Sequence, residues 1–86
     1  MATVDLLYFA RLREAFGIER ERLALPGAVA TTGDLRRFLA GRGETWAREL
    51  DPTRVIRIAV NHDLAEADRP LADGDEVALF PPVTGG

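Results

Sequence analysis

The sequence predicts an α+β fold in which a mixed sheet packs on one main helix. The expected elements occur in the order strand, strand, helix, strand, short connection and final strand. The expected strands alternate between apolar and other residues, and segment 33–40 places its apolar residues on one helical face. Because 47% of the 86 residues are hydrophobic, the chain can form a core, and we expect a single domain over residues 1–86.

The N-terminal part predicts two strands that flank a short helix. Segment 3–10 (TVDLLYFA) is rich in aromatic and β-branched residues, which favour a strand. Segment 10–16 (ARLREAF) has the composition of a helix, and Gly17 suits its end. Segment 19–25 (ERERLAL) partly alternates and predicts a second strand, which a Pro-Gly turn ends.

The main helix is expected over about residues 33–40. Thr31 or Thr32 can cap its start, and Asp34 is favourable near the positive end of the helix dipole. Gly41 is expected to end the helix. Its apolar face consists of Leu35, Phe38 and Leu39.

The second half of the chain predicts a helical turn and two strands. Segment 46–50 has the apolar residues of a helical turn, and the Asp-Pro pair after it stops the helix. Segment 55–61 (VIRIAVN) is the clearest strand, and a turn is expected at 61–63 (NHD). After a second turn at 73–75 (DGD), segment 76–80 (EVALF) forms the last strand, because the prolines that follow cannot continue a ladder.

Alternation assigns the strand residues to two faces of the sheet. The face expected to pack on the helix carries Val4, Leu6, Tyr8, Ile56, Ile58, Val60, Val77 and Leu79. The opposite face, called the open face below, is expected to carry Asp5, Leu7, Phe9, Arg57, Ala59, Glu76, Ala78 and Phe80. Phe9 and Phe80 stand at the ends of their strands, where packing at the core edge and docking of a partner are both open.

The charge and hydropathy patterns exclude several function classes. The net charge is −3, with 14 acidic and 11 basic residues, which is not the electrostatic footprint of a nucleic-acid-binding protein. The apolar stretches are too short to cross a bilayer, and the N-terminus does not resemble a secretion signal. We therefore expect a soluble cytoplasmic protein that binds neither nucleic acid nor membrane.

The residue types present also argue against a metal or cofactor site. The chain has no cysteine, which excludes disulfides, a catalytic thiol, an iron–sulfur cluster and a cysteine zinc site. His62 is the only histidine, and the acidic residues between positions 63 and 75 lack the spacing of an EF-hand. We expect no bound metal and no bound cofactor. Every basic residue is an arginine, so the chain offers no lysine amine.

The C-terminal segment 81–86 (PPVTGG), called the tail below, is the candidate functional element. Pro81 and Pro82 fix φ and stiffen its base in an extended form. Gly85 and Gly86 have no Cβ, so this end of the chain can enter a channel too narrow for side chains. We expect a flexible tail that carries the carboxylate of Gly86 into the active site of another protein.

Three segments resemble a known family: LADGDEVALFPPVTGG at 71–86, AVN at 59–61 and YFARLRE at 8–14. In these segments the chain resembles the small subunit of molybdopterin synthase, which belongs to the ubiquitin-like β-grasp sulfur carriers. The resemblance covers essentially the whole chain, and the predicted element order agrees with it. It implies a β-grasp (ubiquitin-like) fold that ends in the tail.

The resemblance also implies a chemistry and a set of partners. An adenylating activating enzyme would use ATP to convert the carboxylate of Gly86 to a glycyl adenylate, and a sulfur donor would then form a thiocarboxylate. The tail would insert into the large subunit of molybdopterin synthase, where the sulfur attacks a cyclic pterin precursor to build the dithiolene. The implied assembly has two small and two large subunits, and the small subunit is no enzyme by itself. The residues that enter the partner with Gly86 would be Pro81, Pro82, Val83, Thr84 and Gly85.

A partner-binding surface follows from the same resemblance. In the family, the positions that match Phe9, Leu64 and Phe80 form a patch that binds the partner. Arg13 lies in the matching ARLRE segment, where contact with a partner and simple solvation of a helix are both open.

Two other functions remain open on the sequence. Sulfur carriers for thiamine synthesis or for tRNA thiolation share the fold and the Gly-Gly end, although the chain length and the FPPVTGG ending favour the molybdopterin pathway. A β-grasp interaction module without chemistry at its C-terminus would also fit the predicted elements.

Overall fold

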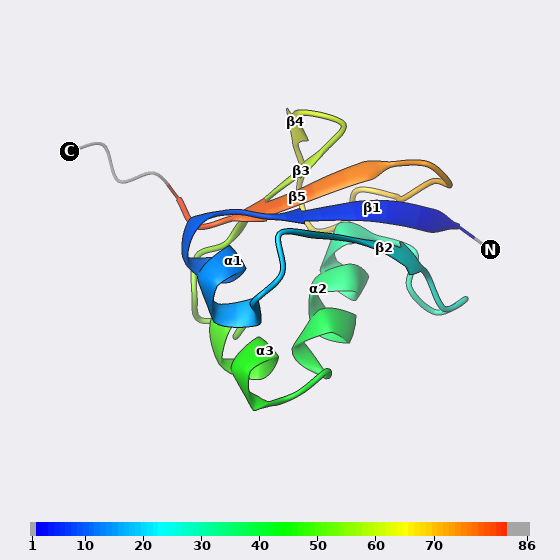
Figure 1. The fold of residues 1–86 in the computed structure, drawn as a ribbon. Coiled ribbons are helices and arrows are strands. Elements are labelled where there is room, and N and C mark those ends of the chain that lie inside the picture. The colour runs from blue at the N-terminus through cyan, green and yellow to red at the C-terminus, as the bar shows by residue number, and fades with distance from the viewer. Residues whose placement is uncertain (1, 83–86) are drawn as a thin grey trace.

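The computed structural model describes residues 2–82, in which a five-stranded sheet carries three helices on one side (Figure 1). The strand order in the sheet is β2-β1-β5-β3-β4. In chain order the elements are β1 (Thr3–Tyr8), α1 (Ala10–Phe16), β2 (Arg20–Ala24), α2 (Thr32–Ala40), α3 (Glu44–Glu49), β3 (Arg57–Val60), β4 (Asp63–Leu64) and β5 (Glu76–Phe80). The α+β fold with a mixed sheet and one main helix, α2, is confirmed.

The first and last strands, β1 and β5, are parallel neighbours at the centre of the sheet. β2 pairs with β1, β3 pairs with β5, and β4 pairs with β3, and all three of these pairs are antiparallel. Parallel neighbours end at the same edge of a sheet. The chain therefore leaves β5 at the edge where β1 ends and α1 begins (Figure 1).

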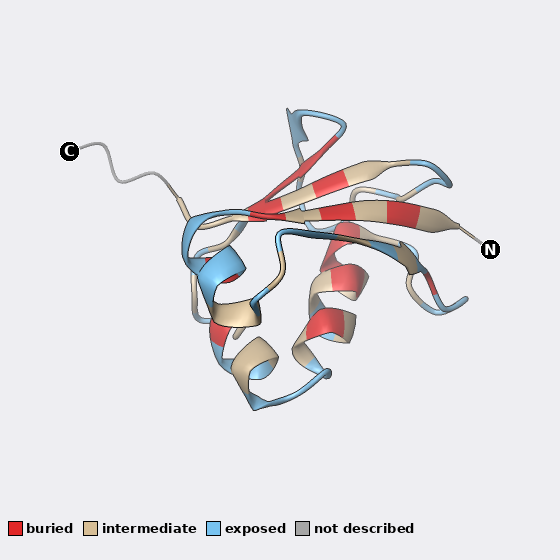
Figure 2. Cartoon of the chain, viewed as in Figure 1, coloured by how far each residue is buried: buried red, intermediate tan, exposed pale blue. Residues whose placement is uncertain are grey.

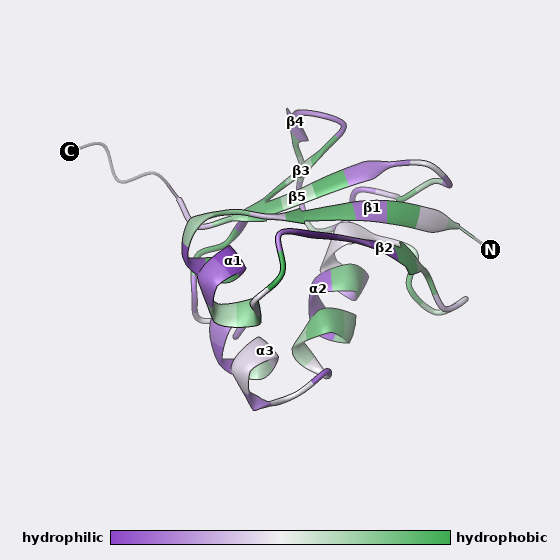
Figure 3. Cartoon of the chain, viewed as in Figure 1, coloured by the Kyte–Doolittle hydropathy of each residue, from purple (hydrophilic) through white to green (hydrophobic). Residues whose placement is uncertain are grey.

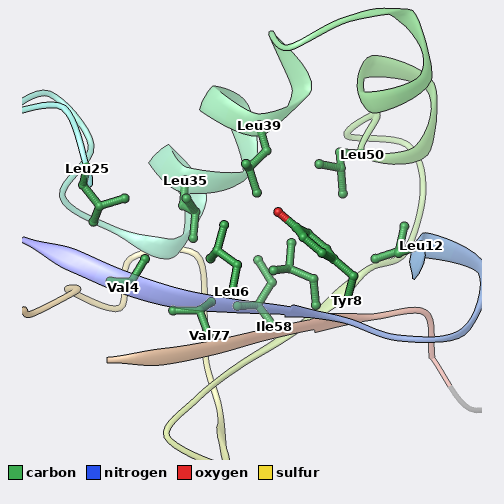
Figure 4. Close-up of a cluster of buried hydrophobic side chains, with 11 residues drawn as sticks. Val4, Leu6, Tyr8, Leu12, Leu25, Leu35, Leu39, Leu50, Ile58 and Val77 are labelled. Atoms are coloured by element: carbon green, nitrogen blue, oxygen red, sulfur yellow. The ribbon is translucent and has the colours of Figure 1, made fainter. Parts of the chain in front are cut away.

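The core lies between the sheet and the helices, where the predicted alternation places it (Figures 2 and 4). The buried strand residues are Val4, Leu6, Tyr8, Ile58, Val60, Val77 and Leu79. Leu35 and Leu39 of α2 pack on them, and Phe38 and Ile56 are partly buried against this cluster. Ala59 was predicted on the open face and is nevertheless buried, because its small side chain lies between the paired residues Leu64 and Ala78.

One buried polar group is built into this core at the end of β1. Tyr8 is 1% exposed, and its hydroxyl donates a hydrogen bond of 2.7 Å to Oε2 of Glu21. Burial and this hydrogen bond raise the pKa of the Tyr8 hydroxyl. Arg42 completes the group with a bidentate contact of 2.7 and 2.9 Å to Glu21, and its guanidinium lies 4.9 Å from the ring centre of Trp46. The group joins β1, β2 and the segment between α2 and α3.

The start of α2 shows why this segment forms the main helix. Thr31 is the N-cap, and its hydroxyl accepts a hydrogen bond of 3.2 Å from the Asp34 amide. The Asp34 carboxylate accepts one of 3.1 Å from the Thr31 amide in return, which completes a capping box. Of the two predicted caps, the structure selects Thr31. Thr32 is buried instead and donates its hydroxyl hydrogen to the Glu66 carbonyl at 2.6 Å.

Several boundaries differ from the prediction. The strands expected over 3–10 and 19–25 are β1 (Thr3–Tyr8) and β2 (Arg20–Ala24), and the helical turn expected over 46–50 is α3 (Glu44–Glu49). The predicted strand from residue 55 begins only at Arg57, since its partner strand β5 ends at Phe80 and the prolines that follow have no amide hydrogen to donate. The two-residue strand β4 was not predicted, because it is too short to show alternation. The turn before it was predicted, and it has positive φ at Asn61 (50°) and His62 (74°).

Candidate functional site

The site predicted from the sequence lies where β5 leaves the sheet. Arg57 is the register partner of Phe80, and Ala59 is that of Ala78. The amide of Phe9 donates a hydrogen bond of 3.2 Å to the Leu79 carbonyl, so the backbone of Phe9 stays beside β5 after β1 has ended. Phe9 and Phe80 therefore lie on neighbouring backbone segments at the same end of the open face.

The three predicted patch residues differ in exposure. Leu64 is 70% exposed and Phe9 is 46% exposed, whereas Phe80 is half-buried. Leu64 pairs with Ala59, which places it on β4 with β3 between it and Phe80. Leu64 and Phe9 are two of the three exposed large hydrophobic residues among residues 2–82. Exposed apolar residues gathered on one face are typical of a surface that binds another protein.

The third exposed large hydrophobic residue, Val55, was not predicted as a site residue. It is 60% exposed and precedes β3, two positions before Arg57. Two-residue periodicity carried back from β3 assigns Val55 to the open face. The sequence contained this signal, but Val55, the first residue of the predicted strand 55–61, was assigned to neither face of the sheet.

Arg13 lies apart from the patch. It is exposed on α1, which covers the core side of the sheet, and its carbonyl accepts a hydrogen bond of 3.0 Å from the Gly17 amide at the end of the helix. Gly17 has φ 72°, the left-handed conformation that glycine tolerates best. The predicted helix end at Gly17 is confirmed, and a partner-binding role of Arg13 stays a prediction.

A pocket of about 330 Å³, called the groove below, opens beside the first two residues of the tail. Its lining residues are Arg11, Leu12, Glu49, Arg54, Val55, Ile56, Pro81 and Pro82. They come from α1, α3, the segment before β3 and the tail, so sequence periodicity gives no sign of it. In Figure 3, α1 carries both hydrophilic and hydrophobic residues.

Glu49 is the buried charged group of the groove, with 3% of its side chain exposed. Arg11 donates from Nε to Oε1 at 2.9 Å and from Nη2 to Oε2 at 3.4 Å. Nε of Arg48 lies 3.5 Å from Oε2, and Nη1 of Arg54 lies 3.6 Å from Oε1. Burial acts to raise the pKa of Glu49, but the hydrogen bonds and charges of these arginines outweigh it and hold the pKa below its ordinary value of 4.5.

The loop that forms one wall of the groove is held by Arg36 of α2. Its Nε donates to the Leu50 carbonyl at 3.0 Å, and its Nη2 donates to the carbonyls of Asp51 and Arg54 at 2.6 and 2.8 Å. One guanidinium thus satisfies three carbonyl groups of a segment without regular structure. This contact fixes the backbone that carries Arg54 and Val55.

The remaining predicted tail residues, Val83, Thr84, Gly85 and Gly86, lie outside the described residues. Pro81 and Pro82 are half-buried and line the groove.

The described residues do not gather the side chains of a metal centre. Within residues 2–82 there is no group of three or more His, Asp or Glu side chains that could hold a metal ion. The His62 side chain is 88% exposed, and its Nε2 lies 3.4 Å from Oε2 of Glu76. No helix of this part of the chain is long and apolar enough to span a membrane. What the described surface offers is contact with other molecules at the base of the tail.

Curated relatives match the chain along almost its full length. A protein named "Molybdopterin synthase sulfur carrier subunit" from Escherichia coli is 41% identical over 83 residues, which cover 96% of this chain and 99% of the relative. A protein of the same name from Haemophilus influenzae is 36% identical with the same coverage of both chains.

Solved structures of similar proteins show the same fold. A putative molybdopterin converting factor subunit 1 from Pyrococcus furiosus has a TM-score of 0.79 at 32% identity and covers 96% of this chain and 100% of its own. SAMP1 from Haloferax volcanii has the same score and identity and covers 99% and 100%. A complex of subunits 1 and 2 of the molybdopterin-converting factor from Helicobacter pylori matches with a TM-score of 0.68 at 29% identity, covering 98% and 99%.

The fold is thus the ubiquitin-like β-grasp that the resemblance implied. A family profile described as "ThiS family" matches residues 6–86, which include the groove, the tail and the whole sheet except the first three residues of β1. The chain belongs to the ThiS family.

Proposed function

We propose that this chain is the sulfur carrier subunit of molybdopterin synthase, a small subunit that donates sulfur within the holoenzyme. The observation that carries the proposal is the 41% identity to a relative of that name over nearly the full length of both chains. The parallel pairing of β1 and β5 supports it, because the tail then leaves the sheet next to the exposed Phe9.

The chemistry takes place on the last carbonyl of the chain. The Gly86 carboxylate attacks the α-phosphate of ATP on the activating enzyme and releases pyrophosphate, which leaves a glycyl adenylate. A sulfur donor then displaces AMP and forms a thiocarboxylate. A carboxylate is a poor electrophile, and adenylation supplies the leaving group that it lacks. The thiocarboxylate sulfur attacks the cyclic pterin precursor, and water then cleaves the acyl–sulfur bond, which leaves the sulfur on the pterin and regenerates the Gly86 carboxylate. Two such transfers build the dithiolene.

The partners divide the remaining work. The large subunit binds the open-face patch formed by Phe9, Leu64 and Phe80 and receives the tail, in an assembly of two small and two large subunits. Val83 and Thr84 make backbone contacts with the channel wall, and Gly85 provides clearance. The activating enzyme and the large subunit supply the acids, bases and phosphate contacts.

Intact-mass measurement tests the carrier chemistry directly. The full chain is incubated with its activating enzyme, ATP and a sulfide source, and fragmentation locates any change of mass. We expect a sulfur-for-oxygen exchange at Gly86. No exchange under conditions that charge a known carrier would leave only an interaction module.

The choice of pathway needs a second measurement. The charged chain is mixed with a molybdopterin synthase large subunit and the cyclic pterin precursor, and dithiolene formation is followed. Charging without sulfur transfer to the pterin, together with transfer in a thiazole-forming or tRNA-thiolating system, would assign the carrier to one of those pathways.

A further inference from the structure

The groove at the base of the tail holds more positive charge than its buried carboxylate can neutralise. Arg11, Arg48 and Arg54 all lie within 3.6 Å of the one carboxylate of Glu49. Asp51 and Arg36 adjoin the same loop and offset each other. The lining residues Arg11, Arg54 and Glu49 leave an excess of one positive charge beside the tail, and Arg48, which contacts Glu49 from outside the lining, raises it to two, in a chain whose net charge is −3.

The arginines are placed to meet another molecule as well as Glu49. The exposed fractions of the Arg11 and Arg54 side chains are 61% and 38%, although both contact a carboxylate that is 3% exposed. Arg11 alone provides the short hydrogen bond that Glu49 needs, at 2.9 Å. The 3.6 Å separation of Arg54 from Glu49 is too long for a good hydrogen bond, so its donors are available to an incoming acceptor.

The floor of the groove is apolar. Leu12, Val55 and Ile56 line it together with the two prolines of the tail, and Val55 is 60% exposed. The groove lies at the start of the tail, because Pro81 and Pro82 line it and directly follow Phe80 in the sequence. A molecule that binds Phe80 and receives the tail therefore comes close to the groove.

We propose that the groove binds a segment of the molybdopterin synthase large subunit that presents an aspartate or glutamate next to an apolar side chain. The carboxylate meets the guanidinium groups of Arg11 and Arg54, and the apolar side chain packs on Val55. The inference rests on the proposed function, because it names the surface of the same partner. The positive charges of Arg11 and Arg54 favour an acidic residue of the partner, and the apolar floor of the groove favours an apolar side chain next to it.

The groove is preorganised for this contact. Arg36 holds the carbonyls of Leu50, Asp51 and Arg54, which fixes the loop before a partner arrives. The Glu49 carboxylate pairs with the guanidinium groups of Arg11 and Arg54, which would otherwise repel each other. A partner carboxylate that enters a fixed set of donors loses less entropy than one that must order them.

The test measures the affinity of the full, uncharged chain for the large subunit from the same organism by titration calorimetry at several salt concentrations. Arg54→Gln is the primary variant, because its long contact with Glu49 contributes little to the fold. Arg37→Gln is the matched control, because it removes the same charge from α2. Arg37 pairs with Asp34 at a distance of 2.7 Å, and neither residue lines the groove. We expect Arg54→Gln to weaken binding by about threefold to fivefold at low salt and to reduce the salt dependence.

The double variant Arg11→Gln/Arg54→Gln extends the test, with thermal unfolding as a check that it still folds. We expect binding about tenfold weaker than that of the wild type at low salt, with little difference at high salt. Equal affinities of Arg54→Gln and Arg37→Gln would overturn the inference.

Two further results separate this inference from the proposed function. If the groove variants bind the large subunit normally but are charged poorly by the activating enzyme, the groove serves that enzyme and the inference is wrong, while the carrier function stands. If the wild-type chain does not bind the large subunit at all, the proposed function fails and the inference fails with it.

Discussion

At the scale of single residues, Arg36 connects the core to the functional surface. It stands on α2, whose apolar face packs in the core, yet its guanidinium satisfies three carbonyls of the loop that carries Arg54 and Val55. Each of these carbonyls would otherwise need water or another donor. The shape of the groove therefore depends on a residue outside its lining.

Replacing Arg36 should destabilise the fold and loosen this loop. We expect Arg36→Gln to lower the free energy of unfolding by about 2–4 kcal/mol, because several charge-assisted hydrogen bonds are lost at once. Urea denaturation measures the change, and Arg37→Gln on the same helix should cost less than about 1 kcal/mol. Equal costs of the two variants would show that the loop does not depend on Arg36.

Glu49 should make stability depend on pH at acidic values. Its pKa is lower in the folded state than its ordinary value of 4.5, so its contribution is fully present above that value and is lost as pH falls through the lower folded pKa. We expect Glu49→Gln to be about 2–3 kcal/mol less stable than the wild type at pH 7, since three arginines lose their shared carboxylate.

Urea denaturation of both proteins from pH 7 down to pH 3 measures this effect. The difference between wild type and Glu49→Gln should narrow as the pH falls below 4.5. A difference that stays constant over this range would mean that folding does not lower the pKa of Glu49.

At the scale of elements, the capping box of α2 shows local sequence and packing acting together. The box orders the first turn through Thr31 and Asp34, while the neighbouring Gly33 packs against the segment 65–69. A Cβ at Gly33 would lie 2.9 Å from the Ala67 carbonyl oxygen, so the helix can approach this segment only with glycine there. The helix start is thus defined by its own sequence and by a distant part of the chain.

Loss of the cap should have a moderate, local cost. We expect Thr31→Ala to lower the free energy of unfolding by about 1 kcal/mol, because the Asp34 amide loses its acceptor. Thr31→Ser keeps the hydroxyl and should stay close to the wild type, and chemical denaturation compares the two. A full loss in Thr31→Ser as well would assign the effect to the methyl group instead.

The sequence predicted the elements whose signals are local. The alternation within β1, the alternation within β5 and the helix end at Gly17 are each encoded within a few residues and needed no distant partner. The start of α2 was predicted with two possible caps, Thr31 and Thr32, of which Thr31 is the observed one. The shortening of β3 needed the knowledge that β5 and its prolines lie beside it. The groove could not be predicted, because Arg11, Glu49 and Arg54 meet only after folding.

At the scale of the whole molecule, the described core and the tail are separate in sequence. The buried residues of the core cluster end at Leu79, and the tail begins two positions later. Stability and sulfur transfer should therefore respond to different changes.

Deletion of Gly86 tests this separation. We expect the free energy of unfolding to stay within about 0.5 kcal/mol of the wild type, because the deletion removes no residue of the core cluster. Sulfur transfer should be abolished, as measured by dithiolene formation with the large subunit. A truncated chain that unfolds, or that still transfers sulfur, would contradict the proposed division of roles.

A charge placed in the patch should weaken partner binding while the tail stays intact. We expect Phe80→Arg to weaken binding of the large subunit by at least about tenfold, because it places an ion in an apolar contact surface. Adenylate formation on the activating enzyme serves as the control for a folded, competent tail. Unchanged affinity would place Phe80 outside the interface.

The central position of β5 has a consequence for folding during synthesis. The strand that precedes the tail is made last, yet it lies between β1 and β3 and joins the two halves of the sheet. A nascent chain that stops before residue 76 lacks the strand that connects β1 with β3. Its apolar residues stay exposed, and proteases can degrade it. Truncated translation products therefore do not fold into a protein that could bind the partners. Only a chain synthesised through β5 can bind them.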